Sequence, residues 1–413
     1  MSQSILSTQA PARRLPLPEF AAMLACLFAI VAFSIDAMLP ALPQIAADLT
    51  PGNVNRAQLI LTAFVAGMGC GTLFVGPISD AIGRKPTITI GFAIYFLAAI
   101  AAILADSIEM LLAARFVQGL GASGPRIVGL AMVRDLYSGR EMARITSLVM
   151  MIFIIIPALA PLIGSGMIWL AGWQGVFAGF LVFAVIGCTW LNLRQGETLP
   201  PARRRPLRLG PLREAAAEVL GSRHVMLCTV ILTLGFAQMF ALLSSSQQLF
   251  AETFGRGDSF PVWFAAVALL SGTSAVLNAT FVTRYGMRRI AKWAYIMQTC
   301  VSAVVLGLFA LNLLPGAMQF PAFFLWMVSV FFMAGVTFGN LNALALQPMG
   351  HIAGMAASIV AAISTVASTL IAAPVGLIYD GTARPVVAAT LICSCLAWYL
   401  MRFLADQDTA IRA

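Results

Sequence analysis

Apolar runs of about 20 residues recur along the chain from residue 20 to residue 404, with only short polar stretches between them. A run of that length is long enough for a helix to span the hydrocarbon core of a bilayer. Charged residues make up 10% of the sequence, whereas a soluble protein carries about 25%. The pattern therefore predicts an all-α integral membrane protein without a water-soluble domain.

The apolar runs predict twelve transmembrane helices, at about residues 19–40, 57–79, 87–105, 109–134, 143–169, 173–193, 224–250, 260–283, 288–312, 320–346, 351–378 and 384–404. Apart from two arginines deep in the fourth helix, the Lys and Arg residues divide unevenly between the two ends of these helices. Twenty lie on the side of the N-terminus, and three, Arg56, Arg256 and Arg384, lie on the other side. Since positively charged loops remain in the cytoplasm, both termini are predicted to be cytoplasmic.

A polar segment at residues 194–222 divides the chain into two similar halves. It holds three prolines and the arginine run 203–205, and its residues from Leu212 to Leu220 favour a short helix at the inner membrane surface. The arginine run either binds lipid or anchors the topology. A shift of 203 residues places Gly83 on Gly286, which indicates an internal repeat. We therefore predict two pseudo-symmetric six-helix bundles, residues 19–193 and 223–404, flanked by cytoplasmic tails at residues 1–18 and 405–413.

Residues 76–86 read GPISDAIGRKP and form a turn between two predicted helices. Asp80 can accept hydrogen bonds from N–H groups at a neighbouring helix start, and Gly83 permits a backbone conformation closed to other residues. The spacing resembles the loop between the second and third helices of the major facilitator superfamily, although that family has an arginine where this chain has Ala81. An ordinary positively charged cytoplasmic turn is the alternative. The resemblance implies a gate on the cytoplasmic side that does not touch substrate, formed by Gly76, Asp80, Gly83, Arg84 and Lys85.

Three ionisable residues lie at membrane depth, where charge is costly and usually functional. Asp36 is the only acid well inside a predicted helix, and Arg115 and Arg126 lie about three turns apart on one face of the fourth helix. A rise of about 1.5 Å per residue places Asp36 roughly 7 Å and Arg115 roughly 9 Å to the outer side of their helix centres. We therefore expect an Asp36–Arg115 ion pair, which either couples proton movement or is purely structural. Arg126 is expected to line the inner half of the central cavity and to tune the charge of the substrate.

Longer stretches narrow the resemblance to one branch of the superfamily. FSIDAMLPALPQIAADL in the first helix, RFVQGLGASGP in the fourth and VRDLYSG after it resemble the Bcr/CflA branch of the twelve-helix drug:proton antiporters. PALAPLIGSG in the fifth helix resembles the antiporter signature, since Pro161 and Gly164 match it and Pro157 precedes them, although Ser165 replaces the last glycine. The resemblance implies a multi-pass protein of the bacterial cytoplasmic (inner) membrane in which Asp36 is protonated during the cycle and Arg115 assists it.

Several other polar side chains within the helices are candidates to line a substrate cavity, and each could instead hydrogen bond to a neighbouring helix. These are Gln118, Gln238, Gln247, Asn340 and Asn342. No metal site is expected because the two histidines are solitary, and no disulfide is expected because the seven cysteines lie in or beside apolar runs. GLGASG at residues 119–124 follows no strand, so no dinucleotide or other cofactor is expected. The net charge of +9 lies mostly in short loops, so topology explains it and no nucleic-acid partner is expected.

These observations predict a transporter and not an enzyme. The first hypothesis is a proton-coupled multidrug exporter of small apolar or cationic drug-like compounds, which works as a monomer by alternating access with Asp36 as proton carrier. The second is a facilitator or proton-coupled carrier of a metabolite such as an amino acid or sugar. The third, a membrane receptor or scaffold, is disfavoured because no signalling domain is evident. The lone acid of the first helix and the prolines of the fifth favour the first hypothesis.

Overall fold

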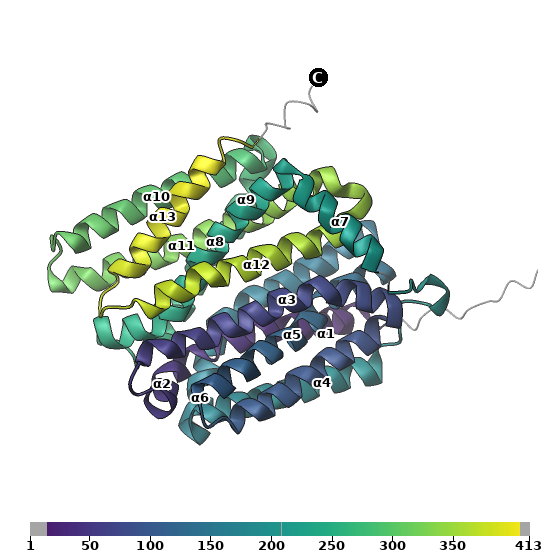
Figure 1. The fold of residues 1–413 in the computed structure, drawn as a ribbon, viewed down its shortest axis with the longest axis horizontal. Helices are drawn as coiled ribbons and strands as arrows, with labels where there is room; N and C mark the ends of the chain where they lie inside the picture. Colours follow the sequence, from purple (N-terminus) through teal and green to yellow (C-terminus); the bar gives the residue numbers. More distant parts are fainter. Residues whose placement is uncertain (1–14, 208, 405–413) are drawn as a thin grey trace, which may run out of the picture.

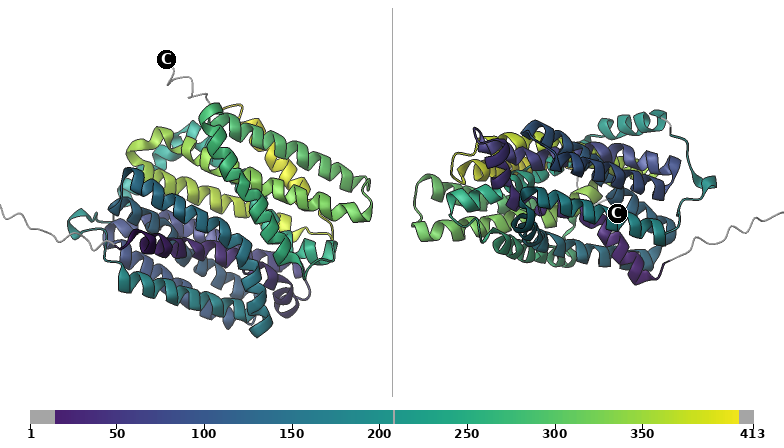
Figure 2. Two further views of the ribbon diagram at one scale, coloured as in Figure 1. Left: turned by 180° about the vertical axis from the view of Figure 1, so that it is seen from behind. Right: turned by 90° about the horizontal axis from the view of Figure 1, so that it is seen from below.

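A computed structural model describes residues 15–207 and 209–404 of the protein, and every regular element in these ranges is a helix. The predicted tails, residues 1–18 and 405–413, therefore lie outside the described residues apart from residues 15–18. Figure 1 shows the helices side by side in two groups, one from each half of the chain, and Figure 2 shows the same groups from behind and from below. The linker between the halves loops out at one end of the molecule.

The first half is built from six α-helices and two short 3-10 helices within residues 17–194. The second part of α6 turns back on the first, because the backbone leaves helical geometry at Ala171 and Gly172, where Gly172 has a φ of 65° that favours glycine. The elements are α1 (Leu17–Asp36), η1 (Leu39–Ala41), α2 (Leu42–Leu49), η2 (Val54–Gln58), α3 (Leu59–Ile82), α4 (Arg84–Ile103), α5 (Ile108–Leu136) and α6 (Gly139–Arg194).

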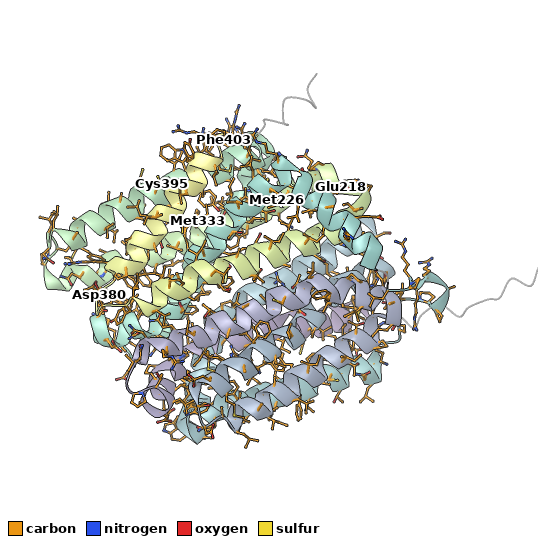
Figure 3. The ribbon with its side chains drawn as sticks, in the orientation of Figure 1. Glu218, Met226, Met333, Asp380, Cys395 and Phe403 are labelled. Carbon is orange, nitrogen blue, oxygen red and sulfur yellow. The ribbon has the colours of Figure 1, made fainter. Side chains whose placement is uncertain are left out.

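The linker contains η3 (Pro201–Arg203) and α7 (Leu209–Gly221), which covers the short helix predicted there. Figure 3 places Glu218, on α7, and Asp380, which follows the helix α12, at opposite ends of the second half. The elements of that half are α8 (Arg223–Gln248), η4 (Leu249–Thr253), α9 (Phe260–Tyr285), α10 (Met287–Ala310), α11 (Gly316–Leu346), η5 (Gln347–Ile352), α12 (Ala353–Leu377) and α13 (Arg384–Leu400).

Eight helical segments of the described chain are long and apolar enough to cross a membrane. Four of them hold more than one element: Leu17–Leu49 holds α1, η1 and α2, Val54–Ile82 holds η2 and α3, Arg223–Thr253 holds α8 and η4, and Gly316–Leu377 holds α11, η5 and α12. The helix α13 is apolar but shorter, and α5, which carries Arg115 and Arg126 within it, is not among the eight. The length and composition of these helices make the chain an all-helical, multi-pass membrane protein.

The helix predicted at about residues 19–40 is present but ends earlier than predicted. The helix α1 ends at Asp36, and the chain continues through η1 into α2. Pro40 explains the break, because a proline lacks an N–H group and its ring clashes with the carbonyl group four residues earlier, which here belongs to Asp36. Asp36 consequently stands at the C-terminal end of a helix, inside an interrupted membrane segment.

Contacts between the halves run along two helix pairs, α3 with α12 and α6 with α9. The end opposite the linker carries an additional polar connection. There, Gln58 Nε2 donates to Gln248 Oε1 at 2.6 Å, and Ser245 Oγ donates to Gln58 Oε1 at 2.8 Å. Asn55 Nδ2 donates to the carbonyl oxygen of Leu377 at 3.1 Å. We call Asn55, Gln58, Ser245 and Gln248 the outer latch, because they tie η2 of the first half to α8 and α12 of the second.

Candidate functional site

Asp36 is enclosed at the end of α1. Its side chain belongs to a residue that is 5% exposed, and within the described residues its carboxylate has no ion-pair partner. A Cβ atom built on Gly164 would collide with the backbone of Ala37, so α6 touches the chain directly beside Asp36. Only glycine allows that approach. Of the two prolines predicted to matter in α6, Pro161 is buried one turn before Gly164, and Pro157 is half-buried.

The predicted Asp36–Arg115 ion pair is wrong, because the Arg115 guanidinium is held by other acceptors. Arg115 is fully buried. Its Nη2 atom donates to the carbonyl oxygen of Ser34 at 3.0 Å, Nε donates to the carbonyl oxygen of Ile60 at 3.4 Å, and Nη1 donates to Gln118 Oε1 at 2.7 Å. The carbonyl groups at the C-terminal end of a helix carry partial negative charge, so the end of α1 stabilises this cation without a carboxylate.

Aromatic rings complete the enclosure of Arg115. The guanidinium carbon lies 4.4 Å from the centre of the Phe64 ring, and 5.9 Å from the centres of the Phe177 and Phe180 rings. Such contacts attract a cation more strongly when it is desolvated. Close by, Ser34 Oγ shares a 2.6 Å hydrogen bond with the Tyr95 hydroxyl group. Ser34 and Tyr95 could not be identified from the sequence, because a hydroxyl group in an apolar run has no distinguishing pattern.

Arg126, three turns along α5 from Arg115, has a contrasting environment. Its side chain is exposed, and within the described residues it forms no ion pair. Its Nη1 atom lies 4.0 Å from Met68 Sδ on α3. On this face of α5, Arg115 is therefore buried with its donors hydrogen bonded, whereas Arg126 is exposed and has no carboxylate partner among the described residues.

The remaining predicted cavity residues divide into two groups. Gln238 accepts a hydrogen bond from Ser394 on α13, and Asn340 donates to Asn278 on α9 at 2.7 Å, so both join helices, as in the alternative interpretation. Gln118 and Gln247 are buried, and each has one side-chain atom without a hydrogen-bond partner in the described chain, Nε2 and Oε1 respectively. Asn342 is exposed near the C-terminal end of α11.

The residues of the predicted gating motif lie around a charged cluster at the linker end of the first half. Arg84 donates to Asp80 at 2.5 Å and to Asp135, at the end of α5, at 2.9 Å. Gly83, between α3 and α4, has a φ of 111° that disfavours any side chain. Lys85 Nζ donates to the carbonyl oxygen of Asn192 at 2.9 Å. Gly76 faces Ser358 of α12 across the seam between the halves.

The role predicted for Asp80 at a helix start belongs to a linker residue instead. The carboxylate of Glu197 accepts hydrogen bonds from the backbone N–H groups of Arg84 at 3.0 Å and Lys85 at 3.1 Å, and so caps α4. Thr198 donates to Asp135 at 3.0 Å. The linker thus joins the cluster, which sequence reasoning missed because no local pattern links a residue of the linker to a turn more than 100 residues earlier.

Comparisons with known proteins agree with this architecture. The family model described as Major Facilitator Superfamily matches residues 24–373. The chain is 30% identical over 394 residues to the multidrug resistance protein MdtL of Escherichia coli, covering 92% of this chain and 95% of that protein. It is 27% identical over 378 residues to a bicyclomycin resistance protein homolog of Haemophilus influenzae, covering 89% and 92%. An uncharacterized MFS-type transporter of Bacillus subtilis, YdgK, is 30% identical over 377 residues, covering 89% and 91%.

Solved structures share the fold at low sequence identity. The xylose transporter XylE of E. coli, in a partially occluded inward-open conformation, superimposes with a TM-score of 0.72 at 13% identity, covering 94% of this chain and 98% of that one. The human organic anion transporter MFSD10 superimposes with a TM-score of 0.68 at 16% identity, covering 94% and 100%. At such identities the likeness concerns the fold alone.

Proposed function

This chain belongs to the major facilitator superfamily of transporters, and we propose that it works there as a proton-coupled exporter of small drug-like molecules in the bacterial cytoplasmic membrane. The relatives named for multidrug and bicyclomycin resistance support this choice, because each aligns over about nine-tenths of the chain. They are consistent with the Bcr/CflA type of antiporter. The chain is accordingly a transporter and not an enzyme.

In the proposed membrane arrangement the chain crosses the bilayer twelve times, and the protein acts as a monomer. One bundle, residues 19–193, holds α1, α3, α4, α5 and the two parts of α6, and the other, residues 223–404, holds α8 to α13. The linker at residues 194–222 and both tails are assigned to the cytoplasm because twenty of the Lys and Arg residues lie on that side. The outer latch then closes the side of the molecule that faces away from the cytoplasm.

The observation that carries the proposal is the environment of Asp36. An acid enclosed at membrane depth is costly as a carboxylate unless a cation neutralises it. Arg115 donates hydrogen bonds to the carbonyl oxygen of Ser34, near the same end of α1, and to Ile60 and Gln118, but not to Asp36. Asp36 is therefore suited to carry a proton while it is enclosed and to lose it when water enters.

The cycle follows from alternating access. Opening of the outer latch would let water and a proton reach Asp36, and closing would enclose the neutral acid. Opening towards the cytoplasm would release the proton there and let substrate bind. Gly164 of α6 lies against the backbone of Ala37, so a movement of the end of α1 must also move α6. In this proposal α6 therefore responds to the protonation of Asp36. The charged cluster around Arg84 holds the inner ends of α3, α4 and α5 together in one of the two states.

The test is transport into inverted membrane vesicles with a panel of antibiotics that includes bicyclomycin, with and without a proton gradient. Asp36→Asn should reduce proton-driven accumulation by about 100-fold or more while the protein still inserts and folds. Downhill exchange of a neutral substrate should survive. Asp380→Asn, which alters an exposed acid outside the helices, is the control and should transport normally. If Asp36→Asn still accumulates substrate against its gradient, another residue couples the proton and the mechanism is wrong.

A further inference from the structure

The face of α5 that carries Arg126 points towards the interior of the protein. Three glycines show where the neighbours of α5 lie: Gly121 touches α4, Gly119 touches α3, and Gly129 touches Phe28 of α1. Phe116 and Val117, on the remaining face, are exposed apolar residues, as expected for side chains that meet lipid. Arg126 lies on the stripe with Arg115 and Gly119, between the contacts with α1 and α3.

The exposed side chain of Arg126 therefore opens on solvent-accessible space on the α1–α3 side of α5, called the hollow below, and not on lipid. Its guanidinium lies beside Met68 on α3. The next residue, Gly69, is so close to Thr365 and Val366 of α12 that a Cβ atom would collide with them. Arg126 thus lies beside α3, close to the point where α3 packs against α12 of the second half.

The charges around this hollow do not balance. Arg115 is enclosed among carbonyl groups, and Asp36 is enclosed at the end of α1. No carboxylate of the described residues pairs with Arg126. An uncompensated guanidinium at this depth is costly unless water or an anionic group solvates it.

We propose that Arg126 is the residue that recognises the substrate, and that the substrate carries a carboxylate or another oxyanion on an apolar body. This deepens the proposed export function and rests on it. A guanidinium presents several N–H donors in a fixed plane that matches an oxyanion, and a charge-assisted pair is about twice as strong as a neutral hydrogen bond. The cationic substrates expected from the sequence would be repelled by the same group.

A test that needs no known substrate measures the electrostatic potential beside Arg126. Leu130 lies one turn further along α5, with its Cβ atom about 6 Å from that of residue 126. The variant Leu130→Cys, in a protein whose native cysteines are replaced, is treated with 2-sulfonatoethyl and 2-(trimethylammonio)ethyl methanethiosulfonate, which differ in charge. The ratio of the anionic to the cationic reaction rate should fall at least about tenfold when Arg126→Gln is added.

The matched control is Arg134→Gln. Arg134 lies one turn beyond Leu130 but in the last turn of α5, where it is exposed to bulk water and screened by salt. It should change the ratio less than about twofold. If Arg126→Gln leaves the ratio unchanged, or if the Leu130→Cys thiol reacts with neither reagent, Arg126 does not face a hydrated hollow and the proposal is wrong.

A second experiment compares the binding of three ligands that have similar shapes but different charges. The probes are 2-naphthoate, 2-naphthylmethanol and 2-naphthylmethylammonium, and binding to the purified protein is measured by calorimetry. The naphthoate should bind at least about tenfold more tightly than the alcohol, Arg126→Gln should abolish that preference, and Arg134→Gln should keep it. Tighter binding of the ammonium probe to the unmodified protein would overturn the proposal.

The two proposals fail separately. The reagent ratio and the naphthoate preference report on the charge of Arg126, whereas proton-driven transport reports on Asp36. A protein that keeps the preference but shows no proton-driven transport would retain Arg126 as an anion site and lose the proposed export mechanism. Proton-driven transport without a preference for the naphthoate would support the proposed export function and contradict the anionic substrate.

Discussion

The two halves of the molecule share a backbone plan but differ in their charges. Gly83 separates α3 from α4 with a φ of 111°, and Gly286 separates α9 from α10 with a φ of 80°. The first turn carries Arg84 between two carboxylates. At the position equivalent to Asp80, the second turn has Thr283, whose hydroxyl group donates to its own helix. The turn therefore needs only the glycine, and the acids of the first half serve another purpose.

The same contrast holds at membrane depth. Asp36, Arg115 and Arg126 all belong to the first half, whereas α8 to α13 carry no Asp, Glu, Lys or Arg at mid-helix. Buried polar groups of the second half, such as Gln238, form neutral hydrogen bonds between helices. The charges on which the proposed proton coupling depends therefore all lie in the first half, whereas polar groups of the second half stabilise its packing.

Loss of Arg115 is the change with the largest expected effect on stability. Arg115→Gln leaves up to three buried acceptors without a donor, at about 1–3 kcal/mol each, so we expect a loss of about 3–5 kcal/mol. Arg115→Lys should also be destabilising, because an ammonium group cannot satisfy acceptors arranged around a planar guanidinium. Unfolding of the purified protein in detergent measures both. Gln238→Leu is the partner variant in the second half and should cost about 1 kcal/mol. Equal costs would remove the distinction between the halves.

The contact between α6 and the end of α1 comes next. Gly164→Ala places a methyl group against the backbone of Ala37, and overpacking of this kind costs about 1–3 kcal/mol. Proton-driven transport should be lost to a greater extent than this loss of stability alone would explain, because the displaced chain carries Asp36. Gly166, two residues along the same helix, has open space where its Cβ atom would lie, so Gly166→Ala should be tolerated. Similar losses in the two variants would show that helix propensity, and not the contact, is responsible.

The fold was largely predictable from the sequence, while the bonding of the site was not. Hydropathy and the positive loops indicated the helices, and the motif at residues 76–86 indicated the family. Pro40 was visible, but its effect on α1 was missed because the apolar run continued past it. The partners of Arg115 were missed because they are backbone carbonyl groups, which no side-chain pattern reveals. Glu197 was missed because a contact of the linker depends on how the chain folds back.

A smaller effect is expected within the charged cluster. Asp135 is 19% exposed in its contact with Arg84, whereas Asp80 is 48% exposed, so the surrounding water screens the Asp80 pair more strongly. Asp135 also accepts a hydrogen bond from Thr198 of the linker. Asp135→Asn should therefore slow transport several-fold and Asp80→Asn less, with substrate binding in detergent nearly unchanged for both. A stronger effect of Asp80→Asn, or a loss of binding, would contradict the gating assignment.

The smallest effect is expected from giving the second half the missing acid. Thr283→Asp restores the carboxylate at the position of Asp80, but Met287 stands where Arg84 would, so the new acid lacks a partner one turn away. Thr283 is exposed, and an exposed substitution of this kind changes stability by less than about 0.5 kcal/mol. The double variant Thr283→Asp with Met287→Arg rebuilds the pair without a counterpart of Glu197 to cap the helix. Transport by both variants should stay within about twofold of the unmodified protein, because an exposed pair adds little. A several-fold change in the double variant would show that the ion pair alone makes a gate, and that the linker contributes nothing to it.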